Sequence, residues 1–200
     1  MICVRGANSE IVKRLQFRGA KVHPVERNAP MPLGCQRYLF CQGMIRPKHI
    51  TLQMPYEIQE TFWANAGYVI RECERLIAEN RDARICIVGS DSGFKWSYDG
   101  AYAASKAALH KFIECKRLKH PNQQLVGVAP SCICDTQSVQ GRGEDGRKAL
   151  DKRLENHPKQ RWIKALEVAN MIYHLMYVDE GYTTGVVIRM NGGEHCGDRW

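Results

Sequence analysis

Short apolar runs alternate with amphipathic stretches along most of the chain. The runs, such as Ile85–Val88, are about as long as an ordinary strand and carry no helical period, which is typical of buried strands. Strands are therefore predicted at residues 1–5, 21–25, 37–41, 83–88, 125–129 and 186–190. The stretches between them repeat apolar residues every three or four positions, which predicts helices at residues 9–17, 56–79, within 98–118 and at 162–177.

This alternation of strands and helices indicates an α/β protein with a parallel sheet covered by helices on both faces. Ligands of such sheets bind at the carboxyl ends of the strands, where the strand order reverses. Residues 137–160 are polar, glycine-containing and charged, and we interpret them as a loop or helical lid over that end. A length of 200 residues favours one domain spanning 1–200.

The composition excludes several classes of protein. No apolar run is long enough to cross a membrane, and the first residues do not resemble a signal peptide, so we expect a cytoplasmic protein without a membrane partner. The net charge is +8, which favours either nucleic acid or an anionic small ligand. The basic residues form no long run and no aromatic stripe accompanies them, so nucleic acid is not expected as a partner.

Nine cysteines are scattered along the chain, and none forms a Cys-x-x-Cys pair. No metal site is therefore predicted. Several of the cysteines lie inside apolar runs, as Cys86 does, where a free thiol packs like a small hydrophobic side chain. We expect reduced thiols, as is usual for cytoplasmic proteins.

The chemistry is carried by Tyr102 and Lys106, which are four residues apart on a predicted helix and therefore share one face. A phenol with an ordinary pKa is a poor acid or base at neutral pH. A neighbouring ammonium favours the phenolate and lowers that pKa, which makes the pair suited to moving a proton on or off an oxygen. A tyrosine and a lysine four residues apart are common in helices, so the surrounding sequence decides whether this pair has a catalytic role.

The context is a buried strand that ends in Ile87-Val-Gly-Ser90, followed by the segment Tyr102-Ala-Ala-Ser-Lys-Ala-Ala108. Further matching segments follow in order: Val128-Ala-Pro130, Glu167-Val-Ala169, Thr184-Gly185 and Asn191-Gly-Gly193. In these residues the chain resembles the short-chain dehydrogenase/reductase superfamily from about residue 37 onward. The resemblance implies a doubly wound Rossmann-type parallel sheet, here of about six strands, and a nicotinamide cofactor.

The resemblance also implies roles for individual residues. Tyr102 is the expected acid/base, and Lys106 lowers its pKa and holds the nicotinamide ribose. Ser90 aligns with the residue that binds the substrate oxygen, and Ser92 is a neighbour able to replace it. Asn65, in the long helix, corresponds to the residue that holds a water in the proton relay.

The first turn departs from the family pattern of three glycines. Gly6 is kept, but Glu10 and Val12 stand where the other two belong. An inward Glu10 repels phosphate, whereas an outward one is a favourable acid in the first turn of a helix. Such a helix start still attracts phosphate, and its expected cofactor contacts are Gly6, Asn8, Ser9 and Ile11.

Cofactor choice depends on Glu26-Arg27 at the end of the second strand. An acid there binds the adenosine ribose of NAD, and an arginine favours the 2′-phosphate of NADP. Both are present, and we favour NAD because Glu26 occupies the family's acidic position.

The segment from residue 28 to residue 41 has room for only a loop and one strand, whereas the family usually fits two helices and an additional edge strand there. Cys41, Gln42 and Gly43 replace its Asn-Asn-Ala-Gly motif and are expected to contact the cofactor. After the fifth strand, the corresponding contacts are Pro130 and Ile133, with Thr136 one position late.

The leading hypothesis is an NAD(P)-dependent oxidoreductase that interconverts a secondary alcohol and a ketone. The alternative is a binding or sensing protein that keeps this fold but has lost or altered its use of the cofactor. The partner is expected to be a small-molecule substrate, either acidic or linked to an acyl carrier, because the lid carries Arg142, Arg147, Lys148, Lys152 and Arg153. A homodimer or homotetramer is expected to form through the helices at 56–79 and 98–118.

Overall fold

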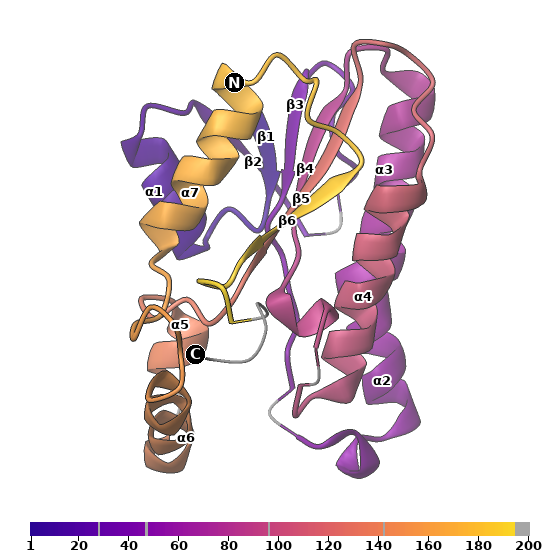
Figure 1. The fold of residues 1–200 in the computed structure, drawn as a ribbon. Helices are drawn as coiled ribbons and strands as arrows, with labels where there is room; N and C mark the ends of the chain where they lie inside the picture. The colour runs from indigo at the N-terminus through magenta and orange to yellow at the C-terminus, as the bar shows by residue number, and fades with distance from the viewer. Residues whose placement is uncertain (28, 47, 96, 142, 195–200) are drawn as a thin grey trace.

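The computed structural model describes residues 1–27, 29–46, 48–95, 97–141 and 143–194. Its centre is a parallel sheet of six strands in the order β2-β1-β3-β4-β5-β6 (Figure 1). The strands are β1 (Ile2–Arg5), β2 (Val22–Val25), β3 (Arg37–Phe40), β4 (Arg84–Val88), β5 (Gln124–Pro130) and β6 (Val186–Met190). This arrangement confirms the predicted fold class and strand number.

The helices cover both faces of the sheet. One face packs against α1 (Glu10–Phe17) and α7 (Ala165–Tyr173), and the other against α3 (Tyr68–Glu79) and α4 (Gly100–Cys115) (Figure 1). Helix α2 (Pro55–Phe62) precedes α3 and packs against α4. Alternate residues of β1 enter the two cores, because successive side chains of a strand point to opposite faces. Each face thus has its own buried apolar cluster.

The chain runs from β1 outward to β2 and then returns to place β3 on the other side of β1. The strand order therefore reverses between β1 and β3, and their carboxyl ends carry Gly6 and Cys41. Such a reversal is where an open α/β sheet binds its ligand.

The sheet ends at β2, with no further strand outside it among the described residues. Pro24 lies within β2, opposite Val4 of β1. A proline is tolerated in a strand when it lies at the edge of a sheet, since it donates no hydrogen bond. The shortening expected from the segment after residue 27 is therefore seen in the strand order.

The segment before β3 packs against α3 and is linked to β1. Met31 is fully buried against α3, and its backbone N–H donates to the Glu72 carboxylate at 2.9 Å. Cys35 is joined to Cys3 of β1 by a disulfide, with 6.5 Å between the Cα atoms. The expectation of reduced thiols is therefore wrong for this pair, since the folded segment brings together two cysteines 32 positions apart.

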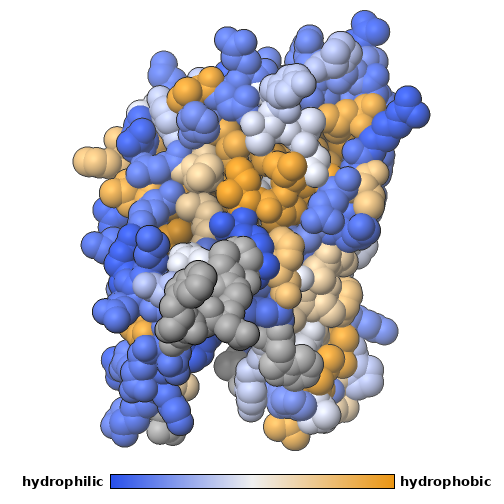
Figure 2. Space-filling model, in the orientation of Figure 1, coloured by the Kyte–Doolittle hydropathy of each residue, from blue (hydrophilic) through white to orange (hydrophobic). Residues whose placement is uncertain are grey.

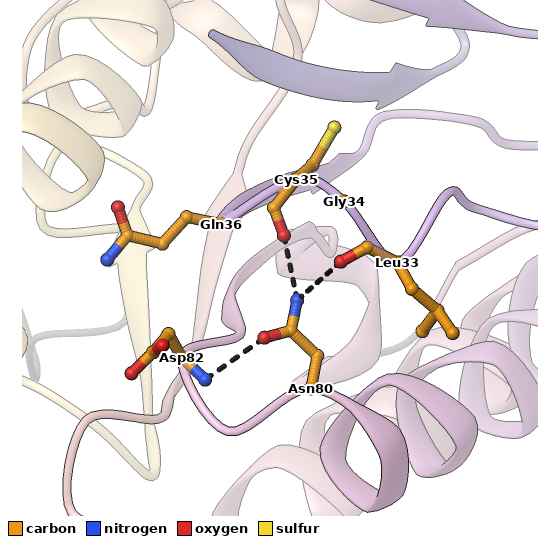
Figure 3. A pocket seen from close by; sticks show the side chains of 6 residues that line it. All are labelled: Leu33, Gly34, Cys35, Gln36, Asn80 and Asp82. Carbon is orange, nitrogen blue, oxygen red and sulfur yellow. Dashed lines mark hydrogen bonds between the residues drawn. The ribbon is translucent and has the colours of Figure 1, made fainter.

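A hollow of about 210 Å³ lies beside this segment, lined by Leu33, Gly34, Cys35, Gln36, Asn80 and Asp82. Figure 3 shows that the Asn80 amide points to the carbonyl groups of Leu33 and Cys35, while the Cys35 sulfur points away from the amide. These residues precede β3 and β4, so the hollow lies at the amino ends of the strands, opposite the expected site.

Two predicted elements differ in detail. The long helix is interrupted by a π-helical turn, η2 (Trp63–Gly67), between α2 and α3. The region interpreted as a loop or helical lid contains α5 (Gln137–Gln140) and α6 (Glu144–Leu154), and α7 begins three residues later than predicted. No helix in the described part of the chain is both long and apolar enough to cross a membrane.

Candidate active site

Helix α4 begins at a fixed point beside the carboxyl ends of the strands. The buried carboxylate of Asp99 caps the helix by accepting the backbone N–H of Tyr102 at 3.0 Å. The same carboxylate accepts the Gln53 side-chain amide at 3.0 Å and the Arg46 backbone N–H at 2.8 Å. The start of α4 is thereby held by the loop that precedes α2, which orients Tyr102.

Lys106 lies one turn further along the same face of α4. Its side chain is buried, and its ammonium donates to the carbonyl of Val88 at the end of β4, at 3.0 Å. The Nζ atom is 5.8 Å from the centre of the Tyr102 ring. Burial lowers the pKa of Lys106 to about 8, and the Cys41 thiol opposes this shift. An ammonium is thus kept in an apolar position beside the phenol.

The pKa of Tyr102 is raised above its ordinary value, chiefly by burial. A hydrogen bond with the Ser90 side chain lowers it, and the Asp99 carboxylate raises it further. The expectation that Lys106 lowers this pKa is therefore not met in the protein alone: the net direction is upward. A phenol with a raised pKa is protonated at neutral pH, which suits a group that gives a proton away.

Ser90 follows β4 directly and caps the short turn η3 (Asp91–Gly93). Its hydroxyl oxygen accepts the Ser92 backbone N–H at 3.2 Å. Ser92 thus contributes its backbone to the orientation of Ser90, and the hydroxyl bonded to Tyr102 is that of Ser90.

Asn65 occupies the π-helical turn η2 and is fully buried. Its side chain pairs with both backbone groups of Met44: it accepts the N–H at 2.7 Å and donates to the carbonyl at 2.8 Å. A Cβ atom placed on Gly43 would be 3.7 Å from the Asn65 Oδ1 atom and 3.9 Å from the Lys106 Nζ atom. Asn65, Gly43 and Lys106 therefore lie together. Single π turns of this kind occur often at functional sites.

The turn between β1 and α1 packs tightly against the end of β3. Gly6 has a φ of +85°, and a Cβ atom there would lie 2.7 Å from backbone atoms of Cys41 and Gln42. Only glycine satisfies both the conformation and the close approach. Ser9 caps α1 by accepting the Val12 N–H at 3.3 Å, and its hydroxyl is 3.1 Å from the Cys41 sulfur.

The two lost glycines of this turn have different consequences. The Glu10 carboxylate pairs with Lys13 and with Arg14, at 3.5 and 3.0 Å, and is therefore an outward acid of the first turn. Val12 is fully buried and packs in the core under α1, as does Ile11. The exposed Asn8 and the N-terminus of α1, which Ser9 caps, follow the carboxyl end of β1 and therefore lie at the same edge of the sheet as the site.

The residues expected to choose the cofactor lie at the end of β2. Glu26 and Arg27 are both exposed. The Arg5 guanidinium donates to the carbonyls of Arg27 and Ala29 and lies over the Tyr68 ring at 4.2 Å, which fixes the path of this segment. A hollow of about 480 Å³ lies nearby, lined by Ala7, Asn8, Lys13, Gln16, Val22 and Pro24.

The remaining expected cofactor contacts lie at the end of β5 and in the residues that follow it. Pro130 is the last residue of β5, and Ile133 forms an isolated bridge with Ile163, ahead of α7. The Thr136 hydroxyl donates to the Ile133 carbonyl at 2.8 Å. The expected contacts after β5 thus lie at the same edge of the sheet as those after β1, β3 and β4.

Two buried residues at this edge, Asp91 and His110, were not predicted from the sequence. Asp91 is buried and bound by Arg189, Asn191 and Lys95, at 3.0, 2.8 and 2.6 Å. His110 is buried beside Ser90. Its position, four residues after Lys106 on α4, is the one signal that pointed to the same face.

The residues present fit a nicotinamide cofactor. Gly6 admits the close approach of two backbones at the strand reversal, and Gly43 leaves open the space in front of Lys106 and Asn65. The capped start of α1 offers backbone N–H groups to a phosphate. Glu10 and Val12 replace two glycines of this turn, but the Glu10 carboxylate pairs with Lys13 and Arg14 of α1.

Comparison with known proteins identifies the family. Residues 57–195 match a family described as enoyl-(acyl carrier protein) reductase. The chain belongs to the short-chain dehydrogenase/reductase superfamily. This match begins in α2 and includes the π turn, α4 and residues 89–93 after β4, which we call the serine turn.

Two further comparisons agree with this membership. The 3-oxoacyl-[acyl-carrier-protein] reductase MabA of Mycobacterium tuberculosis is 30% identical over 138 residues, which are 64% of this chain and 52% of that protein. The match thus spans about half the length of this curated relative.

An oxidoreductase of the superfamily from Burkholderia thailandensis superposes with a TM-score of 0.81 at 19% identity, over 99% of this chain and 93% of that one. ElxO with NADP bound gives 0.80 at 16% identity, over 98% of each chain. At these identities the likeness shows the fold.

Proposed function

We propose that this protein is a nicotinamide-dependent oxidoreductase that interconverts a ketone and a secondary alcohol. The observation that carries the proposal is the convergence of Asn65, Ser90, Tyr102 and Lys106 at the carboxyl ends of β3 and β4. A proton donor, an oxygen-binding hydroxyl and a buried ammonium are together the groups that carbonyl reduction requires.

In this mechanism the Ser90 hydroxyl binds the carbonyl oxygen of the substrate beside the Tyr102 phenol. Tyr102 is protonated at neutral pH and gives its proton to that oxygen as negative charge develops there. Lys106 stabilises the phenolate that is left, since an ammonium in an apolar site interacts strongly with a nearby anion. Asn65 holds the backbone of Met44 and supports the space around Lys106.

A bound nicotinamide supplies the hydride. The residues that would hold it are Lys106 and Tyr102 at the ribose, Gly6, Asn8, Ser9 and Ile11 at the first turn, Cys41, Gln42 and Gly43 after β3, Pro130 and Ile133 after β5, and Glu26 and Arg27 at the adenosine. We keep the preference for NAD, because the exposed Glu26 directly follows β2. A carboxylate there repels a 2′-phosphate.

We propose a 3-oxoacyl thioester as the substrate class, because the relative MabA is named as a reductase of 3-oxoacyl-[acyl-carrier-protein]. The surface around the site supports it. Ile45 follows Met44, Phe94 ends the turn η3 and Tyr98 precedes Asp99. All three are exposed and offer an apolar rim to an acyl chain. Figure 2 shows polar surface over α6, separated by an open notch from the more apolar surface at α2. Of the basic lid residues, Arg147, Lys148, Lys152 and Arg153 are exposed on α6, and Arg142 lies outside the described residues.

The alternative of a binding or sensing protein rests on Glu10 and Val12 in the first turn. It predicts either that no nicotinamide cofactor binds, or that a cofactor binds but no substrate is turned over. Both ideas place the functional site at the same edge of the sheet, so only ligand measurements separate them.

The test is calorimetric titration with NADH and with NADPH, followed by reduction of acetoacetyl-CoA monitored at the nicotinamide absorbance. We expect binding of at least one cofactor and turnover that is absent in Tyr102→Phe. Binding without turnover of acetoacetyl-CoA or of a panel of ketones supports the sensing alternative, and absence of binding overturns the proposed function.

A further inference from the structure

The imidazole of His110 is buried directly behind the serine turn. His110 lies one helical turn after Lys106 on α4, and 3% of its surface is exposed. The backbone N–H of Ser90 donates to its Nε2 atom at 3.4 Å. The mechanism proposed above gives this residue no part, yet it contacts the backbone of the residue that binds the substrate oxygen.

The serine turn is shaped around this ring. A Cβ atom on Gly89 would overlap the Nε2 atom, and one on Gly93 would lie 2.6 Å from the Cε1 atom. Neither glycine has a positive φ, so space and not backbone conformation requires glycine at these two positions. The Phe94 ring packs against the imidazole in a tilted arrangement, with 4.4 Å between the ring centres, and the Arg189 guanidinium lies over Phe94 at 4.5 Å.

The hydrogen bond to Ser90 fixes the state of the imidazole. Because Nε2 accepts a hydrogen bond from the Ser90 backbone N–H, it carries no hydrogen itself, so the ring is neutral with its hydrogen on Nδ1. Nδ1 is buried and has no hydrogen-bond partner among the described residues. Burial, Lys106 and Arg189 lower the pKa of His110 to about 4, while Asp91 opposes the shift. The His110 Nε2 atom therefore remains a hydrogen-bond acceptor throughout the physiological range of pH.

We propose that His110 is a positioning residue for Ser90. Its neutral imidazole holds the Ser90 backbone N–H and fills the space that Gly89 and Gly93 leave open, so that the Ser90 hydroxyl is fixed toward Tyr102 and the substrate oxygen. Asp91, the residue after Ser90, is held by Arg189 and Asn191. Both Ser90 and the residue that follows it are thus held by hydrogen bonds to side chains. This inference rests on the proposed function, because it assigns Ser90 to the substrate oxygen.

Two substitutions separate positioning from packing. His110→Gln places an acceptor oxygen as many bonds from the backbone as Nε2 is, and His110→Phe fills the space without an acceptor. We expect His110→Phe to lower kcat for acetoacetyl-CoA about tenfold or more, since small displacements of reacting groups have effects of this size. We expect cofactor Kd to stay within about twofold, and His110→Gln to restore most of kcat.

Ile113→Val is the matched control, because it reduces another buried side chain of α4 that has no contact with the serine turn in the described structure. It should lower Tm without changing kcat. If His110→Phe keeps the kcat of the wild type, or if His110→Gln and His110→Phe lose the same amount, the positioning role is wrong.

A measurement that needs no turnover keeps this proposal separate from the proposed function. Hydrogen exchange at the Ser90 amide should be faster in His110→Phe and close to wild type in His110→Gln. If the wild type reduces no ketone but the exchange follows this order, the proposed function fails and the contact between His110 and Ser90 stands. Unchanged exchange in His110→Phe overturns the inference.

Discussion

Replacing Lys106 with methionine should make the protein more stable at neutral pH, although it removes an active-site residue. Lys106 is 2% exposed, and its pKa falls from 10.5 to about 8 on burial. This change corresponds to about 3 kcal/mol of stability lost by holding the charged form in the folded protein. Methionine is of similar length and carries no charge.

One favourable interaction is lost in the same substitution. The Val88 carbonyl no longer receives the Lys106 Nζ hydrogen bond of 3.0 Å, which costs about 1 kcal/mol. The net expectation is that Lys106→Met raises the free energy of unfolding by about 2 kcal/mol at pH 7.

The sign of the effect depends on pH. Below the folded pKa of about 8, lysine is charged in both states and the full burial penalty applies. As the pH rises from about 8 to 10.5, the folded protein has already released its proton while the unfolded chain still holds it, so the wild type gains stability. Above 10.5 the penalty is gone, and the variant should then be slightly less stable than the wild type.

Urea unfolding monitored by circular dichroism at pH 7, 9 and 10.5 measures this difference directly. Lys111→Met is the matched control, because Lys111 lies on the same helix with its side chain 75% exposed. It should change stability by less than about 0.5 kcal/mol at each pH. The reasoning is refuted if Lys106→Met is less stable than the wild type at pH 7, or if the difference between the two proteins is the same at pH 7 and 10.5.

The remaining predictions concern the proton donor, the cofactor and the assembly. Tyr102→Phe should lower kcat by at least about a hundredfold while the Kd for cofactor is kept, and titration together with turnover measures both. Glu26→Ser should improve binding of NADPH relative to NADH, whereas tighter binding of NADPH by the unmutated protein would show that Arg27 dominates. We propose a homodimer or homotetramer formed through α2, α3 and α4, so Phe62→Asp, at a side chain that is 37% exposed on α2, should reduce the mass measured by light scattering. A wild type that is already monomeric at micromolar concentration would contradict this assembly.

Much of the fold could be predicted because its signals are local. Runs such as Ile85–Val88 and the helical spacing of Tyr102 and Lys106 determine strand, helix and face within a few residues. The strand count followed from the short segment between Arg27 and Cys41, which has room for only a loop and one strand. The edge position of β2 then accounts for its proline.

The features that were missed depend on contacts between distant segments. The disulfide joins Cys3 and Cys35 because the segment before β3 folds back against α3, and nothing in the local sequence shows this path. The contact of His110 with Ser90 depends on the turn after β4 closing over α4. The direction of the Tyr102 pKa shift also could not be predicted from Lys106, because burial is the largest influence on this pKa and raises it.

The proline of β2 has a consequence for how the protein behaves in solution. A sheet that stops one strand early exposes a new row of backbone groups, and such a row is a template on which another chain can add as a strand and begin aggregation. Pro24 interrupts that row because it has no N–H to offer, and the exposed His23 lies beside it on the same short strand. The shortened sheet thus ends on a strand that resists further growth, and Pro24→Val would convert it into a four-residue site for self-association.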